Sequence, residues 1–292
     1  MQWVMRALLA VALVALGLSF LGMVHPVGDS LAVFRLGIAA LALALLWPAR
    51  PGRLPAILLL GALPLMAAGS VLWHKLPGPE SGALTLYQKN MFHRNSDIAG
   101  LAADILQAAP DIVTLQEVSV ENELLLDLLW QAYPAQHLCR YNRRSGVAVL
   151  TKLPLAQPEG TGRFCSADIG LAGLRVETPA GPHWALSLHL AWPWPGRQPL
   201  QLAKIDAALA QVPGPRLLGG DFNMVPWSHA LRQVARATGA TRAAPSVPSF
   251  SLRGVPLPID HVFAPAGGQA VARPWLGSDH RGLFARLRLS EG

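Results

Sequence analysis

Two short polar segments in the C-terminal half of the chain combine carboxylates, an amide and an imidazole. They are residues 219–223 (GGDFN) and residues 278–280 (SDH). Each adjoins an apolar run that predicts a buried strand, so these side chains are expected at strand ends, where several strands can converge on one pocket. A Gly-Asp-x-Asn stretch alone is as often an ordinary turn. Together, the two segments are typical of enzymes that use a metal ion to hydrolyse phosphate esters.

Four more apolar runs end on, or next to, a polar residue that could join these segments. The complete set is Asn90, Glu117, His189, Asp221, Asn223, Asp260, Asp279 and His280. Taken singly, Glu117 is equally well explained as a charge at a helix start, and a lone histidine is usually structural. In a chain of which only 14% is charged, so many polar residues at strand ends favour a single catalytic pocket.

Between these positions, predicted strands and helices alternate without an internal repeat. Strands are predicted at 83–88, 112–116, 146–151, 171–177, 183–190 and 216–218, and helices at 98–108, 122–132, 200–211 and 228–238. A further strand is expected within 270–276. Residues 75–292 are enough for one layered core, so they are interpreted as a single α/β domain.

The polar motifs follow an order that resembles the endonuclease/exonuclease/phosphatase superfamily, whose fold is that of deoxyribonuclease I. Along the chain, they are Asn90, Gln116-Glu117, Ser187-x-His189, Gly220-Asp221-x-Asn223, Ile259-Asp260-His261 and Ser278-Asp279-His280. The resemblance covers residues 83–288. It implies a four-layer α/β/β/α sandwich with the site at one edge, and a hydrolase that acts on phosphate esters.

The resemblance also implies a divalent cation held by Glu117 with Asn90 and Asp279. Oxygen ligands from several strands suit Mg²⁺, with Mn²⁺ as the alternative. Asp221 is expected to orient or deprotonate the attacking water, and Asn223 to hold a phosphoryl oxygen. These groups are needed because displacement at phosphorus builds up negative charge, which a cation and fixed donors stabilise.

Two histidines and Asp260 complete the implied site. His280 is expected to donate to the phosphate or transfer a proton, and Asp260 to orient its imidazole and favour the charged form. His189 resembles the deoxyribonuclease and sphingomyelinase branches more than the abasic-site endonucleases. Trp192 and Trp194 follow on a stiff loop, where they could stack on a base, contact a lipid or cover the core. The expected substrate is a lipid headgroup or a nucleic acid.

Apolar residues, which make up 52% of the chain, are concentrated at its N-terminal end. Residues 4–24, 27–47 and 54–73 form apolar segments of about 20 residues, a length that spans a hydrocarbon core of about 30 Å. Residues 1–74 are therefore interpreted as a membrane anchor with three transmembrane helices, followed by the catalytic domain at 75–292. A cleaved signal peptide is the alternative for the first segment.

Arginines at position 6 and in the link between the second and third segments place these parts in the cytoplasm. Three spans then predict an integral protein of a bacterial inner membrane, with its catalytic domain facing the periplasm or the outside. The lipid bilayer is an expected partner, and no protein partner is inferred. Cys139 and Cys165 fit either one disulfide in an oxidising compartment or two unrelated buried residues.

The formal net charge of +7 comes partly from the N-terminal arginines, so the remainder is only mildly basic. Arg140, Arg143 and Arg144 surround Tyr141 and are interpreted either as a phosphate contact or as a solvated loop. The alternative function is a catalytically silent module that binds a phosphorylated ligand, but the intact residue set favours the enzyme. A transporter is poorly supported because the apolar segments offer no polar pathway.

Overall fold

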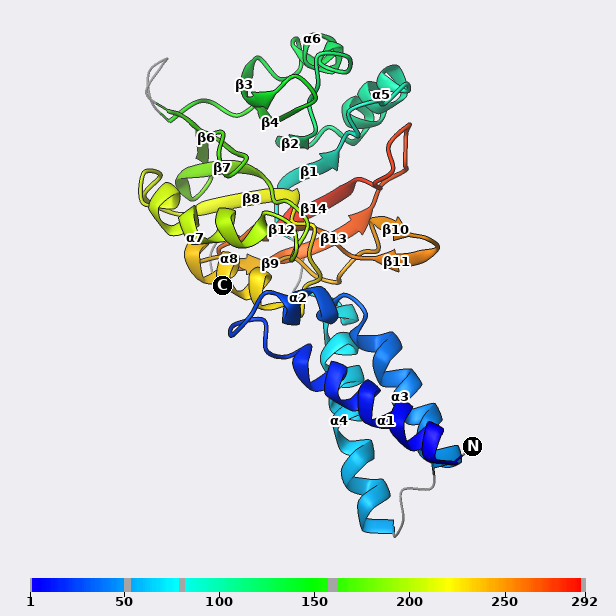
Figure 1. Ribbon diagram of the computed structural model, residues 1–292. Helices are drawn as coiled ribbons and strands as arrows, with labels where there is room; N and C mark the ends of the chain where they lie inside the picture. The colour runs from blue at the N-terminus through cyan, green and yellow to red at the C-terminus, as the bar shows by residue number, and fades with distance from the viewer. Residues whose placement is uncertain (1, 50–53, 79–81, 157–161, 290–292) are drawn as a thin grey trace.

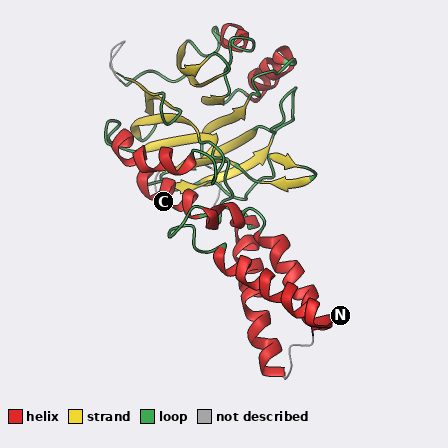
Figure 2. Ribbon diagram, viewed as in Figure 1, coloured by secondary structure: helices red, strands yellow, loops and turns green. Residues whose placement is uncertain are grey.

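An N-terminal helical arm leads into a body made of two β-sheets with helices on their outer faces (Figure 1). The computed structural model describes residues 2–49, 54–78, 82–156 and 162–289. Figure 2 shows that the described strands are confined to the body, whereas the arm is helical. The predicted site residues all lie in the body.

The first sheet has six strands in the order β13-β14-β1-β2-β4-β3. They are β1 (Leu84–Asn90), β2 (Ile112–Gln116), β3 (Ala135–Asn142), β4 (Ser145–Thr151), β13 (Gly268–Ala272) and β14 (Leu283–Leu287). β1 and β2 run parallel, with Asn90 opposite Gln116, and the other neighbours are antiparallel. Because parallel strands end at the same edge of a sheet, Glu117, which follows β2, lies at the edge where β1 ends.

The second sheet has the order β5-β6-β7-β8-β12-β9. Its strands are β5 (Arg163–Ser166), β6 (Leu171–Thr178), β7 (Gly181–His189), β8 (Arg216–Asp221), β9 (Thr241–Arg242) and β12 (Asp260–Ala264), and a hairpin of β10 (Phe250–Leu252) and β11 (Val255–Leu257) precedes β12. The parallel pair β7 and β8 places His189 opposite Asp221. The antiparallel pair β8 and β12 places Asp260 on the other side of Asp221. The register therefore puts three predicted site residues in one row.

Three buried clusters define four layers. One cluster fills the space between the sheets. The helices of the body are α5 (Ile98–Ala108), α6 (Leu124–Leu129), α7 (Gln198–Leu209) and α8 (His229–Thr238). α5 and α6 cover the outer face of the first sheet, and α7 and α8 cover that of the second. Each fully buried Leu or Val contributes roughly 1.5–3 kcal/mol to this packing. The α/β sandwich implied by the resemblance is present.

A disulfide joins Cys139 on β3 to Cys165 on β5, with the two Cα atoms 5.3 Å apart. β3 is an edge strand of the first sheet and β5 is an edge strand of the second. The bond therefore links the two sheets covalently and restricts the unfolded chain. Of the two interpretations of the cysteines, the disulfide is the correct one.

The arm does not contain the transmembrane helices predicted at 4–24, 27–47 and 54–73. Its helices are α1 (Gln2–Leu18), α2 (Val27–Ala32), α3 (Arg35–Ala49), α4 (Leu54–Leu72) and the short 3₁₀ helix η1 (Trp73–Lys75). The first helix ends before its apolar run does, and the second run is divided between α2 and α3. In the described part of the chain, no helix has the combined length and hydropathy needed to cross a membrane. The predicted membrane anchor and the integral location in a bacterial inner membrane, facing the periplasm, are therefore wrong.

Two charges inside the second apolar run connect the arm to the body. Asp29 and Arg35 are only 5% and 3% exposed. The Asp29 carboxylate accepts the backbone N–H groups of His229 at 2.7 Å and Ala230 at 2.8 Å, at the start of α8. Arg35 donates to the carbonyl of Trp227 at 3.4 Å. A carboxylate satisfies unpaired N–H groups at a helix N-terminus, so these charges hold the arm on the body.

Replacing Asp29 with alanine is expected to lower the free energy of unfolding by about 1–3 kcal/mol, because a buried and a part-buried N–H group at the start of α8 lose their acceptor. Asp29→Asn keeps one acceptor oxygen and should lose less. Chemical denaturation monitored by circular dichroism measures both changes. Asp97→Ala is the control, since Asp97 caps α5 within the body by accepting the Gly100 N–H at 3.1 Å, a contact worth about 1 kcal/mol. If Asp29→Ala lowers the free energy of unfolding no more than Asp97→Ala does, Asp29 does not hold the arm on the body.

Candidate active site

Five strands present polar residues at one edge of the sandwich. Asn90, His189 and Asp221 are the last residues of β1, β7 and β8, and Asp260 is the first of β12. Glu117 follows β2 and has a left-handed backbone with φ of 55°. This conformation is strained for a residue other than glycine, and such strain is often found at functional sites. The strand-end placement predicted for these five residues is observed.

Asp221 lies at the centre of the cluster. Its Oδ2 accepts a hydrogen bond from Asn90 Nδ2 at 2.9 Å and lies 3.6 Å from His189 Nε2 and 3.8 Å from His280 Nε2. Its Oδ1 accepts the backbone N–H of Asn223 at 2.8 Å. Burial raises the pKa of Asp221 to about 7, although the charge of His280 acts to lower it. A carboxylate with this pKa is suited to take a proton from water near neutral pH.

His280 and Asp260 form a buried ion pair. His280 Nδ1 lies 2.7 Å from Asp260 Oδ2, while Asp260 Oδ1 accepts Gln88 Nε2 at 2.9 Å. Burial lowers the pKa of His280, but Asp260 and Asp221 outweigh that effect and raise it to about 10. Burial acts to raise the pKa of Asp260, but the charge of His280 brings it below its ordinary value. The imidazole is therefore protonated at neutral pH and presents its Nε2–H to Asp221.

Glu117 lies beside this cluster in the first sheet. Its Oε1 accepts Asn90 Nδ2 at 3.1 Å, and its Oε2 accepts the backbone N–H of His93 at 3.1 Å. Burial acts to raise the pKa of Glu117, but the neighbouring His189 and these donors lower it below its ordinary value. Asp279 is exposed by its surface area and has no hydrogen bond with Glu117 or Asn90 among the contacts of the described residues. Partial desolvation and the charge of Glu117 nevertheless raise the pKa of Asp279, although the charge of His280 opposes this. The structure thus joins Asn90 to Glu117 by a hydrogen bond and places Asp279 within electrostatic range of Glu117.

Two groups of residues could hold a divalent cation. Asp221, Asp260 and His280 each place one ligand atom within 4.8 Å of the other two. However, Asp260 and His280 are hydrogen-bonded to each other. The protonated imidazole of His280 also has no lone pair with which to bind a metal. Glu117 is ionised and Asn90 offers an amide oxygen, and hard oxygen ligands suit Mg²⁺ or Mn²⁺. The donor chemistry favours the Glu117 side for the cation and leaves the His280 side for proton transfer.

Asn223 holds the chain segment that follows β8. Its Nδ2 donates to the carbonyl of Leu190 at 2.8 Å and lies 3.4 Å from Asp221 Oδ2. Its backbone is left-handed, with φ of 48°. The amide nitrogen that was expected to hold a phosphoryl oxygen is therefore engaged with the protein itself. In this arrangement Asn223 positions Asp221 through its backbone N–H.

Tyr141 sets the orientation of His189, a role that the sequence did not indicate. Ser145 Oγ donates to the Tyr141 hydroxyl at 2.7 Å, and that hydroxyl lies 2.8 Å from His189 Nδ1. Because Tyr141 already accepts from Ser145, its own proton points to Nδ1, and the proton of a neutral His189 is then on Nε2, facing Asp221. Burial lowers the pKa of His189, although Glu117 opposes this, so the ring is neutral. The one available signal was the basic cluster around Tyr141.

Lys89 anchors the segment that carries Asp279 and His280. Its ammonium group is buried and donates to the carbonyls of Trp275 and His280, both at 2.6 Å, and to that of Pro274 at 3.2 Å. Burial lowers the pKa of Lys89 to about 8. Three polar residues in a row, Gln88 to Asn90, close an otherwise apolar strand, and this pattern could have indicated that all three belong to the site.

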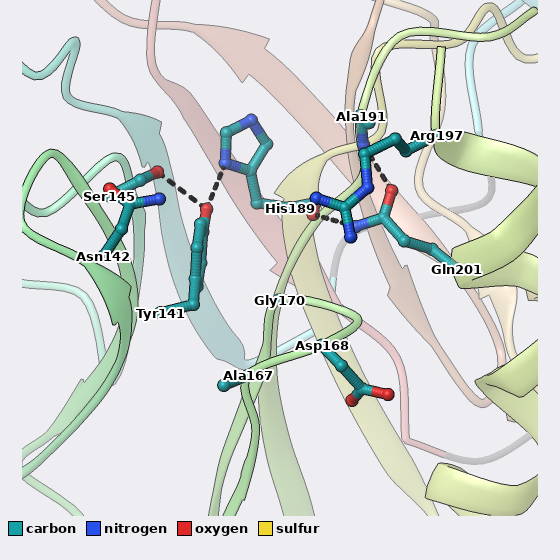
Figure 3. A pocket seen from close by; sticks show the side chains of 10 residues that line it. All are labelled: Tyr141, Asn142, Ser145, Ala167, Asp168, Gly170, His189, Ala191, Arg197 and Gln201. Atoms are coloured by element: carbon teal, nitrogen blue, oxygen red, sulfur yellow. Dashed lines mark hydrogen bonds between the residues drawn. The ribbon is translucent and has the colours of Figure 1, made fainter.

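The surroundings of the two histidines differ in chemistry. The ring of Phe250 lies 4.9 Å from that of His280, and Trp192 packs edge-on against Phe250 at 5.9 Å. His189, in contrast, borders a polar pocket of about 500 Å³ (Figure 3). Trp194 instead contacts the arm, where its carbonyl accepts the Ser30 hydroxyl at 2.6 Å. The two tryptophans of this loop therefore have separate roles, and Trp192 is the one near the site.

Comparison with known proteins agrees with this geometry. The sequence model of the Endonuclease/Exonuclease/phosphatase family matches residues 87–280, and the chain belongs to this family. A search of curated proteins found no match.

Solved structures show the same fold. Truncated TDP2 from Caenorhabditis elegans is 17% identical over 69% of this chain and 96% of its own, with a TM-score of 0.52. Sphingomyelinase C from Streptomyces griseocarneus is 18% identical over 70% of this chain and 99% of its own, with a TM-score of 0.52. Beta toxin from Staphylococcus aureus is 15% identical over 70% and 100%, with a TM-score of 0.51. At these identities the likeness concerns the fold.

Tyr141→Phe is expected to release the tautomer of His189, because Nδ1 loses its hydrogen-bond donor. Nitrogen-15 NMR of the ring should then show a larger population with the proton on Nδ1, and catalysis should fall roughly tenfold. Tyr133→Phe is the control, since the Tyr133 hydroxyl donates to the Pro110 carbonyl at 3.1 Å, away from the site. Unchanged His189 ring shifts in Tyr141→Phe would contradict the assignment.

Asp260→Asn is expected to lower the pKa of His280 from about 10, because burial is then opposed by less negative charge. In EDTA, the wild-type ring should stay protonated from about pH 6 to about pH 9, whereas the variant should lose its proton within that range. An NMR pH titration measures both. His261, whose pKa burial lowers to about 3, should remain neutral in both proteins. A variant His280 that is still charged at about pH 9 would show that Asp260 is not what holds the proton.

Proposed function

We propose that this protein is a divalent-metal-dependent hydrolase of phosphate esters, with phosphodiesters as its main substrates. The observation that carries the proposal is the arrangement around Asp221, whose Oδ2 faces the Nε2 atoms of both His189 and His280. The imidazole of His189 is neutral and that of His280 is charged. A general base, Asp221, therefore lies next to two hydrogen-bond donors that differ in charge. Membership of the Endonuclease/Exonuclease/phosphatase family supports this chemistry.

In the proposed reaction, Asp221 accepts a proton from the attacking water as the water oxygen bonds to phosphorus. The bond between phosphorus and the leaving oxygen breaks, and His280 donates the proton that this oxygen requires. His189 donates its Nε2–H to a phosphoryl oxygen and remains neutral. Proton transfer by positioned groups of this kind contributes typically about 10²–10⁴-fold to the rate. Asp260 keeps His280 oriented and favours its charged form, which is restored when the proton taken up by Asp221 passes to His280.

Glu117 and Asn90, with Asp279, would hold the cation, Mg²⁺ or Mn²⁺. When bound, it supplies positive charge to the phosphoryl and leaving oxygens. Glu117 is already ionised, and Lys89 fixes the segment that carries Asp279. The oxygen donors of these residues are of the kind that a hard cation prefers.

A lipid headgroup and a nucleic acid are the two substrate classes that we propose. One of the similar structures is a sphingomyelinase by name, which supports lipid phosphodiesters as a proposed substrate class. The aromatic pair Trp192 and Phe250 next to His280 offers a surface on which a base could stack, which supports nucleic acid.

The full-length chain should be assayed with Mg²⁺ and with EDTA on single-stranded DNA, duplex DNA, sphingomyelin, phosphatidylinositol phosphates and a chromogenic phosphodiester. Asp221→Asn and Glu117→Gln are each expected to reduce metal-dependent turnover by at least about 100-fold, because the first removes the base and the second a cation ligand. Circular dichroism should show that both variants are folded. Asp206→Asn, an exposed change on α7, should have no effect.

Retention of most activity in both site variants would overturn the mechanism. A folded protein that binds Mg²⁺ but hydrolyses none of these compounds would instead favour a catalytically silent module that recognises a phosphorylated ligand.

A further inference from the structure

The polar pocket beside His189 adjoins the position where the scissile phosphate would bind. One of its walls comes from the end of β3 and includes Asn142, and the other comes from Arg197 and Gln201 at the start of α7 (Figure 3). Its volume of about 500 Å³ is large enough for a substantial part of a substrate. A group bound here would lie directly next to a phosphate held at Asp221.

Most polar groups of the lining are already used within the protein. Gln201 Oε1 accepts the Ala191 N–H at 2.7 Å, and Gln201 Nε2 donates to the carbonyls of Ile169 at 3.0 Å and His189 at 3.1 Å. Both donors and an acceptor of this amide therefore hold the pocket wall in shape. Gln201 is a structural part of the pocket and has no hydrogen left for a ligand.

Asp168 is the acidic residue of the lining, and its charge is compensated. Its carboxylate lies 2.8 Å from Lys204 Nζ, and it accepts the Ser166 hydroxyl at 2.8 Å. These contacts hold the pKa of Asp168 below its ordinary value, so it stays ionised and paired. Asp168 therefore does not give the pocket a net negative charge.

The guanidinium of Arg197 is the cationic group of the lining. Among the described residues it has no hydrogen bond or ion pair, and it lines the same pocket as His189 and Gln201 (Figure 3). Asn142 Oδ1 accepts the Arg144 N–H at 2.8 Å, which leaves the amide nitrogen of Asn142 as a second donor. Arg140 does not contribute, because it is paired with Glu123.

The rest of the lining excludes other kinds of ligand. Its apolar members are the small residues Ala167, Gly170 and Ala191, which offer no surface for an acyl chain. A quaternary ammonium group would meet the charge of Arg197 and would lack an aromatic cage, since the described lining offers a single Phe, Tyr or Trp ring, that of Tyr141. The pocket thus offers the unpaired guanidinium of Arg197 and the amide donor of Asn142 between walls of small residues. These features suit an anionic group that accepts several hydrogen bonds.

We propose that this pocket is a subsite for a second phosphate of the substrate, recognised by Arg197 next to the phosphate that is cleaved. This inference rests on the proposed function and narrows it to substrates that carry a further phosphate near the scissile ester. Short oligonucleotides and phosphorylated inositol headgroups share this chemistry. A substrate with one phosphate and a cationic headgroup does not use the subsite.

A matched pair of chromogenic esters tests the inference on the full-length protein. The first is the p-nitrophenyl ester of thymidine 5′-phosphate, and the second is the same compound with an added 3′-phosphate. The wild type is expected to favour the second by about tenfold in kcat/KM, since a hydrogen bond to a charged group contributes that much. Arg197→Ala should remove this preference, and Arg197→Lys should keep part of it. Arg236→Ala, the loss of an exposed arginine on α8, should leave it unchanged.

Equal use of both esters by the wild type, or a preference that survives in Arg197→Ala, would overturn the subsite while leaving the proposed hydrolysis intact. If neither ester is hydrolysed, the proposed function fails but the subsite is still tested by calorimetry in EDTA. Thymidine 3′,5′-bisphosphate should bind more tightly than thymidine 5′-phosphate, and Arg197→Ala should abolish the difference. No difference in the wild type would overturn the inference in that case as well.

The same calorimetry with inositol 1-phosphate and inositol 1,4-bisphosphate distinguishes the source of the second phosphate. A preference that depends on Arg197 in the thymidine pair alone assigns the subsite to nucleic acid, and one in the inositol pair alone assigns it to a lipid headgroup. Absence of the preference in both pairs would overturn the subsite.

Discussion

The burial of one carboxylate, Asp221, is the constraint on which the site depends. A buried carboxylate is unfavourable unless donors and positive charge surround it. Here the Asn90 amide, the Asn223 N–H and the charged His280 supply them. Asn90 comes from the first sheet and Asp221 from the second, so the central strands of both sheets have to end at the same edge. The four-layer packing and the registers of β8 with β7 and β12 provide that geometry.

The two imidazoles beside this carboxylate differ in protonation state. His280 Nδ1 faces the ionised Asp260, which together with Asp221 outweighs burial and keeps a proton on the ring. His189 Nδ1 faces the Tyr141 hydroxyl, and burial lowers the pKa of the ring, so it is neutral. Equivalent side chains thus obtain different protonation states from the balance of burial and neighbouring charge. That difference is what allows one histidine to transfer a proton while the other only donates a hydrogen bond.

The helical arm shows why apolar composition was a poor guide to membrane crossing. Large apolar side chains such as Trp3, Val11 and Trp47 are exposed on its helices, in keeping with the apolar composition of this end of the chain. The length of an apolar run, however, does not fix the length of a helix, which depends on an unbroken series of backbone hydrogen bonds. Between α2 and α3 that series is interrupted, and Asp29 and Arg35 on either side of the break reach the body.

The family, the sandwich and the strand-end positions of residues such as Asn90, Asp221 and Asp260 could be predicted from the sequence. This was possible because strand alternation and the polar residues that close each strand are local properties of the chain. The disulfide, the anchoring by Lys89 and the pairing of Tyr141 with His189 became clear from the three-dimensional structure. These contacts join residues far apart in the chain, and the protonation state of each group depends on burial, which no local pattern specifies.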